Sequence, residues 1–271
     1  MKNSFILIFL FAVATSQAAE PLKALLITGG CCHDYKNQQT IIVEGMKSRM
    51  NITFDLIFDD PKTQELPALI QGVDWAKKYD IVVHNQCWAK IKEPKVVEDF
   101  VTAQKNAKVG AAVIHCAMHT FRDTPSKAWD NFSGVESRRH GPKYPIRIKK
   151  VAPVHPVIKG VPDNWLTKNG ELYATKPVET CTPLAEGFKD GQEEKTRQVC
   201  IWVVDDEGTR IFGTSLGHHN ETMLDEVWLD LLSRGLLWSV NKLQDDGSPA
   251  EGYAGHGNDV IIEALRGRFG K

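Results

Sequence analysis

In the first half of the chain, short apolar runs alternate with segments whose apolar residues recur at helical spacing. Residues 23–30 (KALLITGG) form an apolar run that ends in two glycines, and residues 35–50 carry apolar side chains along one face of a helix. These two patterns are typical of a buried strand and of a helix packed on a sheet. The pattern continues with strands predicted at 52–60, 79–85 and 107–115 and helices predicted at 68–78 and 96–106.

In the second half of the chain, the strands follow one another without long helices between them. Short β-like runs separated by turn residues are predicted at 144–153, 170–178, 179–188, 197–208 and 209–219. An amphipathic helix is predicted at 222–240, and a polar, glycine-rich tail follows it from residue 242 to 271, with a short helix at 260–269. We expect one domain over residues 22–241 with a peripheral tail.

Together these patterns predict an α/β fold with a mainly parallel sheet. Strands that alternate with helices form parallel sheets with helices on both faces and right-handed connections. The later β-like runs either extend this sheet or form a small antiparallel annex to it.

The first residues of the chain predict export. Residues 1–18 combine a lysine, an apolar stretch and small residues at Ser16 and Ala18, which is typical of a secretory signal cut after Ala18. No other stretch is long and apolar enough to suggest a membrane span. We therefore expect a periplasmic or secreted protein.

Charge and cysteine content narrow the picture further. Among 271 residues, Lys and Arg number 33 and Asp and Glu 34, so the chain lacks the basic excess typical of nucleic-acid-binding proteins. Six cysteines permit disulfides in an exported protein, and Cys181 and Cys200 lie in successive strand-like segments where they could pair. The sequence leaves their connectivity and the oligomeric state open.

Reactive side chains follow three of the predicted parallel strands. The segments CCHDY, HNQCW and HCAMH come directly after strands one, three and four of the chain. Because ligands bind beyond the carboxyl ends of parallel strands, these segments should share one rim of the sheet. We expect Cys32 or His33, Cys87 and His115 to meet there, with His84 as a further plausible neighbour.

Several ordered motifs resemble one known family. HCAMHTF, HPVIKGVP, GTRIFGTSLGHHNET and LLSRGLLWSV are similar to segments of the trehalose-utilisation (ThuA-like) family, over roughly residues 22–241. That family has a domain similar to the class I glutamine amidotransferase fold, so the resemblance implies a flavodoxin-like α/β domain connected with sugar metabolism, in particular with glycosides or keto-sugars.

One interpretation of the histidine-rich rim is a metal site. His33, His119 and His218 are candidate ligands of a divalent transition metal such as zinc, with Glu171 or Asp34 as the carboxylate. Without a metal, one of these histidines would act as a general acid or base and others would bind sugar hydroxyls. In either case His33, His119, His218 and Glu171 are the candidate catalytic residues.

The remaining candidates concern substrate binding and an alternative nucleophile. His115, Arg122 and Trp88 are candidate substrate-binding residues, through hydrogen bonds, a charged contact and ring stacking. His115 and His119 share a helix face only if the residues after Ile114 are α-helical. Cys116 is a candidate nucleophile, although it lacks the flanking glycines of a tight nucleophile elbow.

The sequence thus favours an exported enzyme that acts on a small carbohydrate by hydrolase, lyase or isomerase chemistry. Two alternatives stay open: a non-catalytic carbohydrate-binding module on the same fold, and a cysteine hydrolase that uses Cys116. A pocket in which ionisable groups converge would favour catalysis, and one lined by stacked tryptophans would favour binding.

Overall fold

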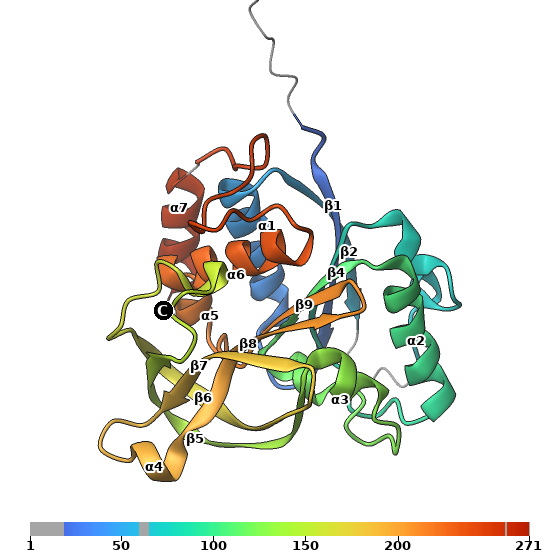
Figure 1. Ribbon diagram of the computed structural model, residues 1–271, viewed down its shortest axis with the longest axis horizontal. Coiled ribbons are helices and arrows are strands. Elements are labelled where there is room, and N and C mark those ends of the chain that lie inside the picture. Colours follow the sequence, from blue (N-terminus) through green and yellow to red (C-terminus); the bar gives the residue numbers. More distant parts are fainter. Residues whose placement is uncertain (1–18, 60–64, 258, 271) are drawn as a thin grey trace, which may run out of the picture.

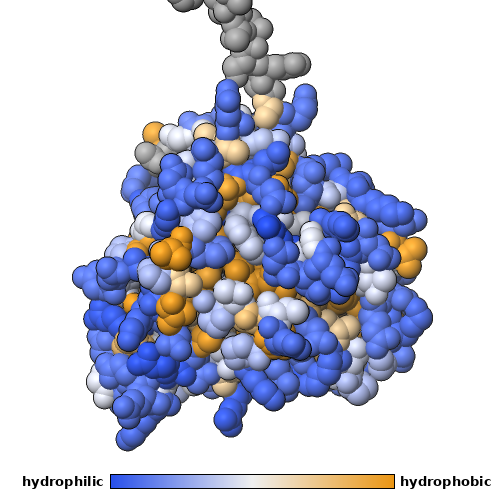
Figure 2. All heavy atoms as spheres, in the orientation of Figure 1, coloured by the Kyte–Doolittle hydropathy of each residue, from blue (hydrophilic) through white to orange (hydrophobic). Residues whose placement is uncertain are grey.

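The computed structural model describes residues 19–59, 65–257 and 259–270, and it builds them around a single nine-stranded sheet (Figure 1). The predicted signal peptide, residues 1–18, lies outside the described residues. Among the helices described, none has the length and apolar character needed to cross a membrane. Hydrophilic side chains cover most of the face shown in Figure 2.

The strands are β1 (Leu22–Gly30), β2 (Ile52–Asp59), β3 (Ile81–Cys87), β4 (Gly110–Ile114), β5 (Val135–Lys150), β6 (Leu166–Pro177), β7 (Cys181–Phe188), β8 (Gln198–Asp206) and β9 (Thr209–Thr214). The α-helices are α1 (Tyr35–Arg49), α2 (Pro94–Ala107), α3 (Ala128–Ser133), α4 (Glu193–Thr196), α5 (Asn220–Met223), α6 (Glu226–Ser239) and α7 (Asp259–Phe269). Four 3-10 turns complete the description: η1 (Ala68–Ile70), η2 (Trp75–Lys78), η3 (His115–His119) and η4 (Pro156–Ile158).

The sheet has a parallel half and an antiparallel half. Strands β2-β1-β3-β4-β9 are parallel and follow the flavodoxin-like order, while β8, β7, β5 and β6 continue the same sheet in antiparallel pairs. The predicted α/β fold is confirmed. The β-like runs of the second half extend the main sheet, which was one of the two arrangements that the pattern allowed.

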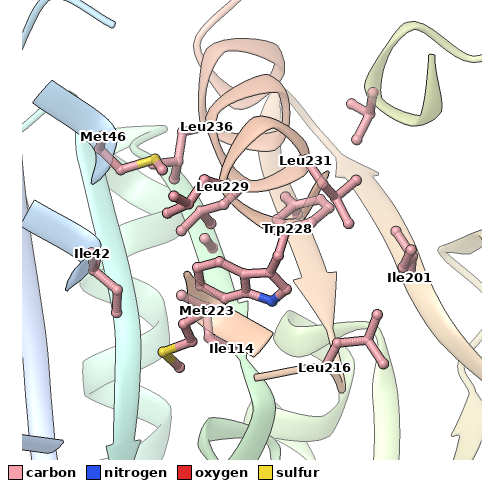
Figure 3. Close-up of a cluster of buried hydrophobic side chains, with 14 of the residues drawn as sticks. Ile42, Met46, Ile114, Ile201, Leu216, Met223, Trp228, Leu229, Leu231 and Leu236 are labelled. Atoms are coloured by element: carbon pink, nitrogen blue, oxygen red, sulfur yellow. The ribbon is translucent and has the colours of Figure 1, made fainter. Parts of the chain in front are cut away.

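Two cores lie on opposite faces of the sheet. Because successive side chains of a strand point to opposite faces, Leu26 of β1 joins the core under α1 and α6, while Leu25 and Ile27 join the core under α2 and α3. In the first core the indole of Trp228 is surrounded by aliphatic side chains from α6 and the sheet (Figure 3). These cores fix the strand ends that carry the site.

The helix predicted at residues 68–78 is wrong. The segment forms only the two short turns η1 and η2, because Gly72 between them has a φ of +82° that an α-helix does not allow. The helices predicted at 35–50, 96–106 and 222–240 are confirmed as α1, α2 and α6, with α5 as a separate turn before α6.

The C-terminal segment is part of the packed structure and not the peripheral tail that we expected. Ile262 and Leu265 of α7 are buried in the core beside α1, and Ala254 forms an antiparallel bridge with Met50. Figure 1 shows α7 lying alongside α1. Helix α7 and the segment around Ala254 therefore pack onto the domain.

Candidate functional site

The turn after β4 places a buried histidine at the carboxyl end of the sheet. His115, the first residue after the strand, has a φ of +47°, a left-handed conformation that is costly for a residue with a side chain and is often found at functional sites. Its Nδ1 lies 2.6 Å from the carbonyl oxygen of Ser215. Because a carbonyl only accepts, Nδ1 carries the proton and Nε2 presents its lone pair to the rim.

The turn after β9 brings a second histidine to the same point. Gly217 has a φ of +116°, and a Cβ there would approach side-chain atoms of Met223 and Trp228 to 3.1 and 3.3 Å. Glycine thus lets the chain turn so that His218 faces the rim. The Nδ1 atom of His218 lies 3.3 Å from Nε2 of His115.

A carboxylate from the antiparallel half of the sheet completes the contact. Glu171 of β6 is largely buried, and its Oε2 lies 3.1 Å from Nδ1 of His218 and 3.9 Å from Nε2 of His115. The imidazole lone pair and the carboxylate are both acceptors, so they need a proton or a cation between them. In the metal-free protein, the proton on Nδ1 of His218 fills that role.

The turn after β1 supplies a third histidine. The ring of His33 lies 4.7 Å from that of His115 and 4.9 Å from that of His218, measured between ring centroids. Its Nδ1 is buried and has no hydrogen-bond partner among the described residues. A buried polar atom is costly unless a partner such as a bound ligand satisfies it, so Nδ1 of His33 is available to one.

We call His33, His115, Glu171 and His218 the His/Glu quartet. One ligand atom from each residue lies within 4.8 Å of the others, so the quartet could hold a metal ion. Three imidazoles and one carboxylate match the donors that zinc and similar transition metals prefer. Burial and the neighbouring imidazoles lower the pKa of His115 well below its usual value and that of His218 to about 3, which keeps both in the neutral form that binds metals.

The quartet opens into a polar pocket of about 510 Å³. Its lining includes His33 and His218 from the quartet together with Asp34, Lys143, Asn220 and Glu221. The carboxylate of Asp34 accepts hydrogen bonds from the side-chain amides of Asn37 and Asn220, which hold it in place. The volume is within the usual range for small-molecule sites.

His119, which we predicted as a metal ligand and catalytic residue, does not join the quartet. Its Nε2 lies 3.0 Å from Oγ of Ser137, and its Nδ1 lies 3.5 Å from the guanidinium of Arg122. The segment after Ile114 is the 3-10 turn η3 and not an α-helix, so with about three residues per turn two residues four apart point to different sides. His115, predicted to bind substrate, takes the place expected for His119.

Three other candidates lie away from the pocket. Trp88 is 1% exposed and packs in the core under α2, so it cannot stack on a sugar. Arg122 is exposed and contacts His119 and Asp123, and it is not among the residues that line the pocket. His84 is fully buried between Gln86 and Gln104, so it does not reach the rim.

Two further residues near the quartet were not among the candidate site residues predicted from the sequence. Nε2 of His140, on β5, lies 3.7 Å from Oε2 of Glu171. The ring of Tyr173, on β6, stacks on His115 with centroids 4.6 Å apart. Their strands pair at His140 and Tyr173, but irregularities in the register on both sides of His140 leave no local signal for this contact in the sequence.

The predicted shared rim of His33, Cys87 and His115 is confirmed, since the rings of His33 and His115 lie 4.7 Å apart and Cys87 contacts Cys116, the residue after His115. The Sγ atoms of Cys87 and Cys116 lie 3.0 Å apart, and Cys31 packs against the cluster that these two residues form with Tyr35. Cys31 forms a disulfide with its neighbour Cys32.

The pairing considered between Cys181 and Cys200 is wrong, since both are free. Cys181 lies opposite Val204 in the sheet, and Sγ of Cys200 contacts the carbonyl oxygen of Ala185 instead. The two residues are therefore out of register for a disulfide.

Comparison with known proteins gives one family and several similar folds. The family model described as trehalose utilisation (ThuA) matches residues 23–239. Crystal structures of ThuA-like proteins from Parabacteroides merdae and Bacteroides uniformis are similar, with TM-scores of 0.62 each and identities of 21% and 15%. They match 87% and 88% of this chain, and 97% and 99% of theirs.

The crystal structure of Agd3, a carbohydrate deacetylase, is also similar, with a TM-score of 0.53, 11% identity, and coverage of 87% of this chain and 33% of that one. No curated protein matches the chain. At these identities the structural likenesses show a shared fold, in agreement with the fold class predicted from the sequence.

Proposed function

Because the chain belongs to the trehalose-utilisation (ThuA) family, we propose that it is an exported enzyme that acts on a small carbohydrate, a keto-sugar or glycoside derivative. The His/Glu quartet would bind a divalent transition metal of the zinc type, and the pocket above it would take the sugar. The family description supports a carbohydrate substrate, and the pattern of residues 1–18 supports export.

The observation that carries the proposal is the convergence of ligand atoms in the quartet. The Nε2 lone pair of His115, the carboxylate of Glu171 and the unpartnered Nδ1 of His33 gather in a largely buried place. Buried lone pairs that face one another are costly unless a cation lies between them. A bound metal would polarise a sugar oxygen or activate a water molecule.

The protein's own groups orient the ligands and the substrate. The hydrogen bond to the Ser215 carbonyl fixes the tautomer of His115, as is common for metal-binding histidines. Asp34 is held by two amides at the pocket wall, where its carboxylate is suited to accept hydrogen bonds from sugar hydroxyls. His140, close to Glu171 and partly exposed, is placed to accept or donate a proton at the edge of the site.

These features favour an enzyme over a binding module. Ionisable groups converge on one point, as catalysis requires. The residues that line the pocket include Phe269 but no tryptophan on which a sugar ring could stack. Cys116 is not among the residues that line the pocket, and its Sγ contacts Cys87, which disfavours it as a nucleophile for a sugar in the pocket.

Two measurements on the purified protein test the proposal. Elemental analysis should find about one zinc-like ion per chain, and turnover of a keto-disaccharide should fall when a chelator removes it and return when the metal is restored. Protein that binds no divalent metal and turns over the sugar equally well with chelator would exclude the metal-assisted reaction. Metal binding without turnover of any keto-sugar or glycoside would favour the binding module.

A further inference from the structure

Four cysteines lie close to His33 and His115 of the quartet, in the chain or in space, and one of them, Cys32, lines the pocket. We call Cys31 and Cys32 the vicinal pair and Cys87 and Cys116 the buried pair. The vicinal pair is joined by a disulfide, and the Sγ atoms of the buried pair lie 3.0 Å apart as thiols. The four residues come from the ends of β1, β3 and β4, which are neighbours in the sheet.

The sheet holds the two pairs against each other. Gly30 pairs with Cys87 in the register of β1 and β3, and a Cβ on Gly30 would come within 2.4 Å of the Cys87 carbonyl oxygen. The next residue, Cys31, packs against the cluster of buried side chains that Tyr35, Cys87 and Cys116 form. The hydroxyl of Tyr35 is buried and has no hydrogen-bond partner among the described residues, so a polar group faces this cluster.

From this arrangement we propose that the four cysteines form a dithiol–disulfide exchange site. The thiolate of Cys116 attacks a sulfur of the vicinal disulfide, and the other sulfur of that disulfide leaves as a thiolate and takes up a proton. Cys87 then attacks Cys116 in the mixed disulfide and releases the second vicinal thiol. The products are a disulfide in the buried pair and two thiols in the vicinal pair, so two electrons and two protons change places without an external oxidant.

Exchange at this site would change the position of His33 in the quartet through the backbone that joins it to Cys32. Cys32 has a φ of +87°, a costly conformation for a residue with a side chain, and it directly precedes His33. The vicinal disulfide holds that turn closed. When the disulfide moves to the buried pair, the turn is free to relax, and His33 loses its fixed position opposite His115 and His218. This second step, unlike the exchange itself, rests on the proposed metal site.

The exchange is tested by locating the disulfide in the intact protein. Wild-type protein is held in glutathione buffers of graded ratio, quenched with acid, alkylated and digested with trypsin. Cleavage after lysine and arginine separates the vicinal pair (24–36), Cys87 (79–90) and Cys116 (109–122) into three peptides. We expect a disulfide within peptide 24–36 in one part of the population and a link between peptides 79–90 and 109–122 in another.

The variant Cys87→Ser should stop the exchange after its first step, at the mixed disulfide. Without Cys87, the mixed disulfide between Cys116 and the vicinal pair should accumulate as a link between peptides 24–36 and 109–122. Cys181→Ser, which changes a free cysteine in β7, is the control and should leave the wild-type pattern unchanged. If the buried pair of the wild-type protein is alkylated as free thiols at every glutathione ratio, the exchange is excluded even where the variant fails to fold.

The coupling to His33 has its own measurement. Cys31→Ser removes the vicinal disulfide and should weaken Zn²⁺ binding at least about 10-fold, as for other changes that disturb the support of a ligand, whereas Cys181→Ser should not change it. Equal affinities of wild type and Cys31→Ser would exclude the coupling. If wild-type protein binds no Zn²⁺ at all, the proposed metal site fails, and the peptide map still decides the exchange.

Discussion

Nε2 of His115 and Nδ1 of His218 lie 3.3 Å apart across the carboxyl ends of β4 and β9. The two residues are 103 positions apart in the chain and meet because these two strands are parallel neighbours. Each histidine follows its strand through a residue with positive φ, His115 itself on one side and Gly217 on the other. The site is therefore built by two sharp turns on one edge of the sheet.

Zinc should stabilise the folded protein through the quartet. At a free Zn²⁺ concentration about 100 times the Kd, we expect the free energy of unfolding to rise by about 2.7 kcal/mol, because the ion binds only the folded chain. His218→Ala removes one ligand and should lower the affinity at least about 100-fold, so the same zinc concentration should give little stabilisation. Denaturant titrations with and without zinc measure both effects.

The matched control is His256→Ala, which removes an exposed histidine outside the quartet. This variant should gain the same stability from zinc as the wild type. A loss of zinc stabilisation in His256→Ala, or its full retention in His218→Ala, would assign the metal to another site.

Gly217→Ala should damage the pocket more than the fold. A side chain at a φ of +116° costs about 1–3 kcal/mol of stability, and its Cβ would press on Met223 and Trp228, so the turn that aims His218 should shift. We expect turnover and Zn²⁺ affinity to fall at least about 10-fold. Gly191→Ala is the control, since Gly191 also has positive φ but has no atom within 4 Å of its Cβ position.

In Gly191→Ala the positive φ should lower the melting temperature, because a residue with a side chain is strained there, while the zinc affinity should stay as in the wild type. Gly217→Ala protein with wild-type zinc affinity would show that His218 does not depend on this turn.

Cys116→Ser should keep most of the turnover. Cys116 contacts Cys87 and does not line the pocket, whereas His33 and His218 of the quartet do. Steady-state kinetics with a keto-disaccharide, at wild-type metal content, measure the effect. An inactive serine variant beside an active His218→Ala would support the cysteine hydrolase instead.

Local sequence patterns predicted the frame of the site. The apolar run before Gly29 and Gly30 and the helical spacing after Tyr35 are one strand and one helix, because such patterns depend on near neighbours in the chain. The shared rim followed from the rule that parallel strands end at one edge. From that rule alone we predicted that His33 and His115 lie on the same rim.

The sequence could not show that His115 lies in the quartet in the position expected for His119. The spacing of the two histidines fits an α-helix as well as a 3-10 turn, and the backbone conformation of one residue, His115, decides which side chain faces the quartet. The contact between His140 and Glu171 could not be predicted from the sequence either. It depends on an antiparallel pairing with register shifts, and such pairing is set by contacts across the sheet.

His84 should make stability depend on pH even though it lies outside the site. Its Nε2 donates to Oε1 of Gln104 and its Nδ1 accepts from the amide of Gln86, so the neutral ring is satisfied on both sides. Burial lowers its pKa from 6.5 to about 4. The unfolded chain therefore binds the proton more readily than the folded chain between these values, and stability falls as the pH drops through that window. From pH 7 to pH 5 this residue should account for a loss of about 2 kcal/mol.

His84→Gln keeps a donor and an acceptor at this position and removes the titrating ring. The free energy of unfolding is measured by urea titration at pH 7 and at pH 5. Between these pH values, we expect the free energy of unfolding of the variant to fall by about 2 kcal/mol less than that of the wild type, because position 84 no longer takes up a proton on unfolding. His256→Gln, which changes an exposed histidine, should keep the full wild-type loss. An equal loss in wild type and His84→Gln would mean that His84 is not the buried group that resists protonation, and that the acid sensitivity comes from other histidines with a lowered pKa, such as His115, His155 and His218.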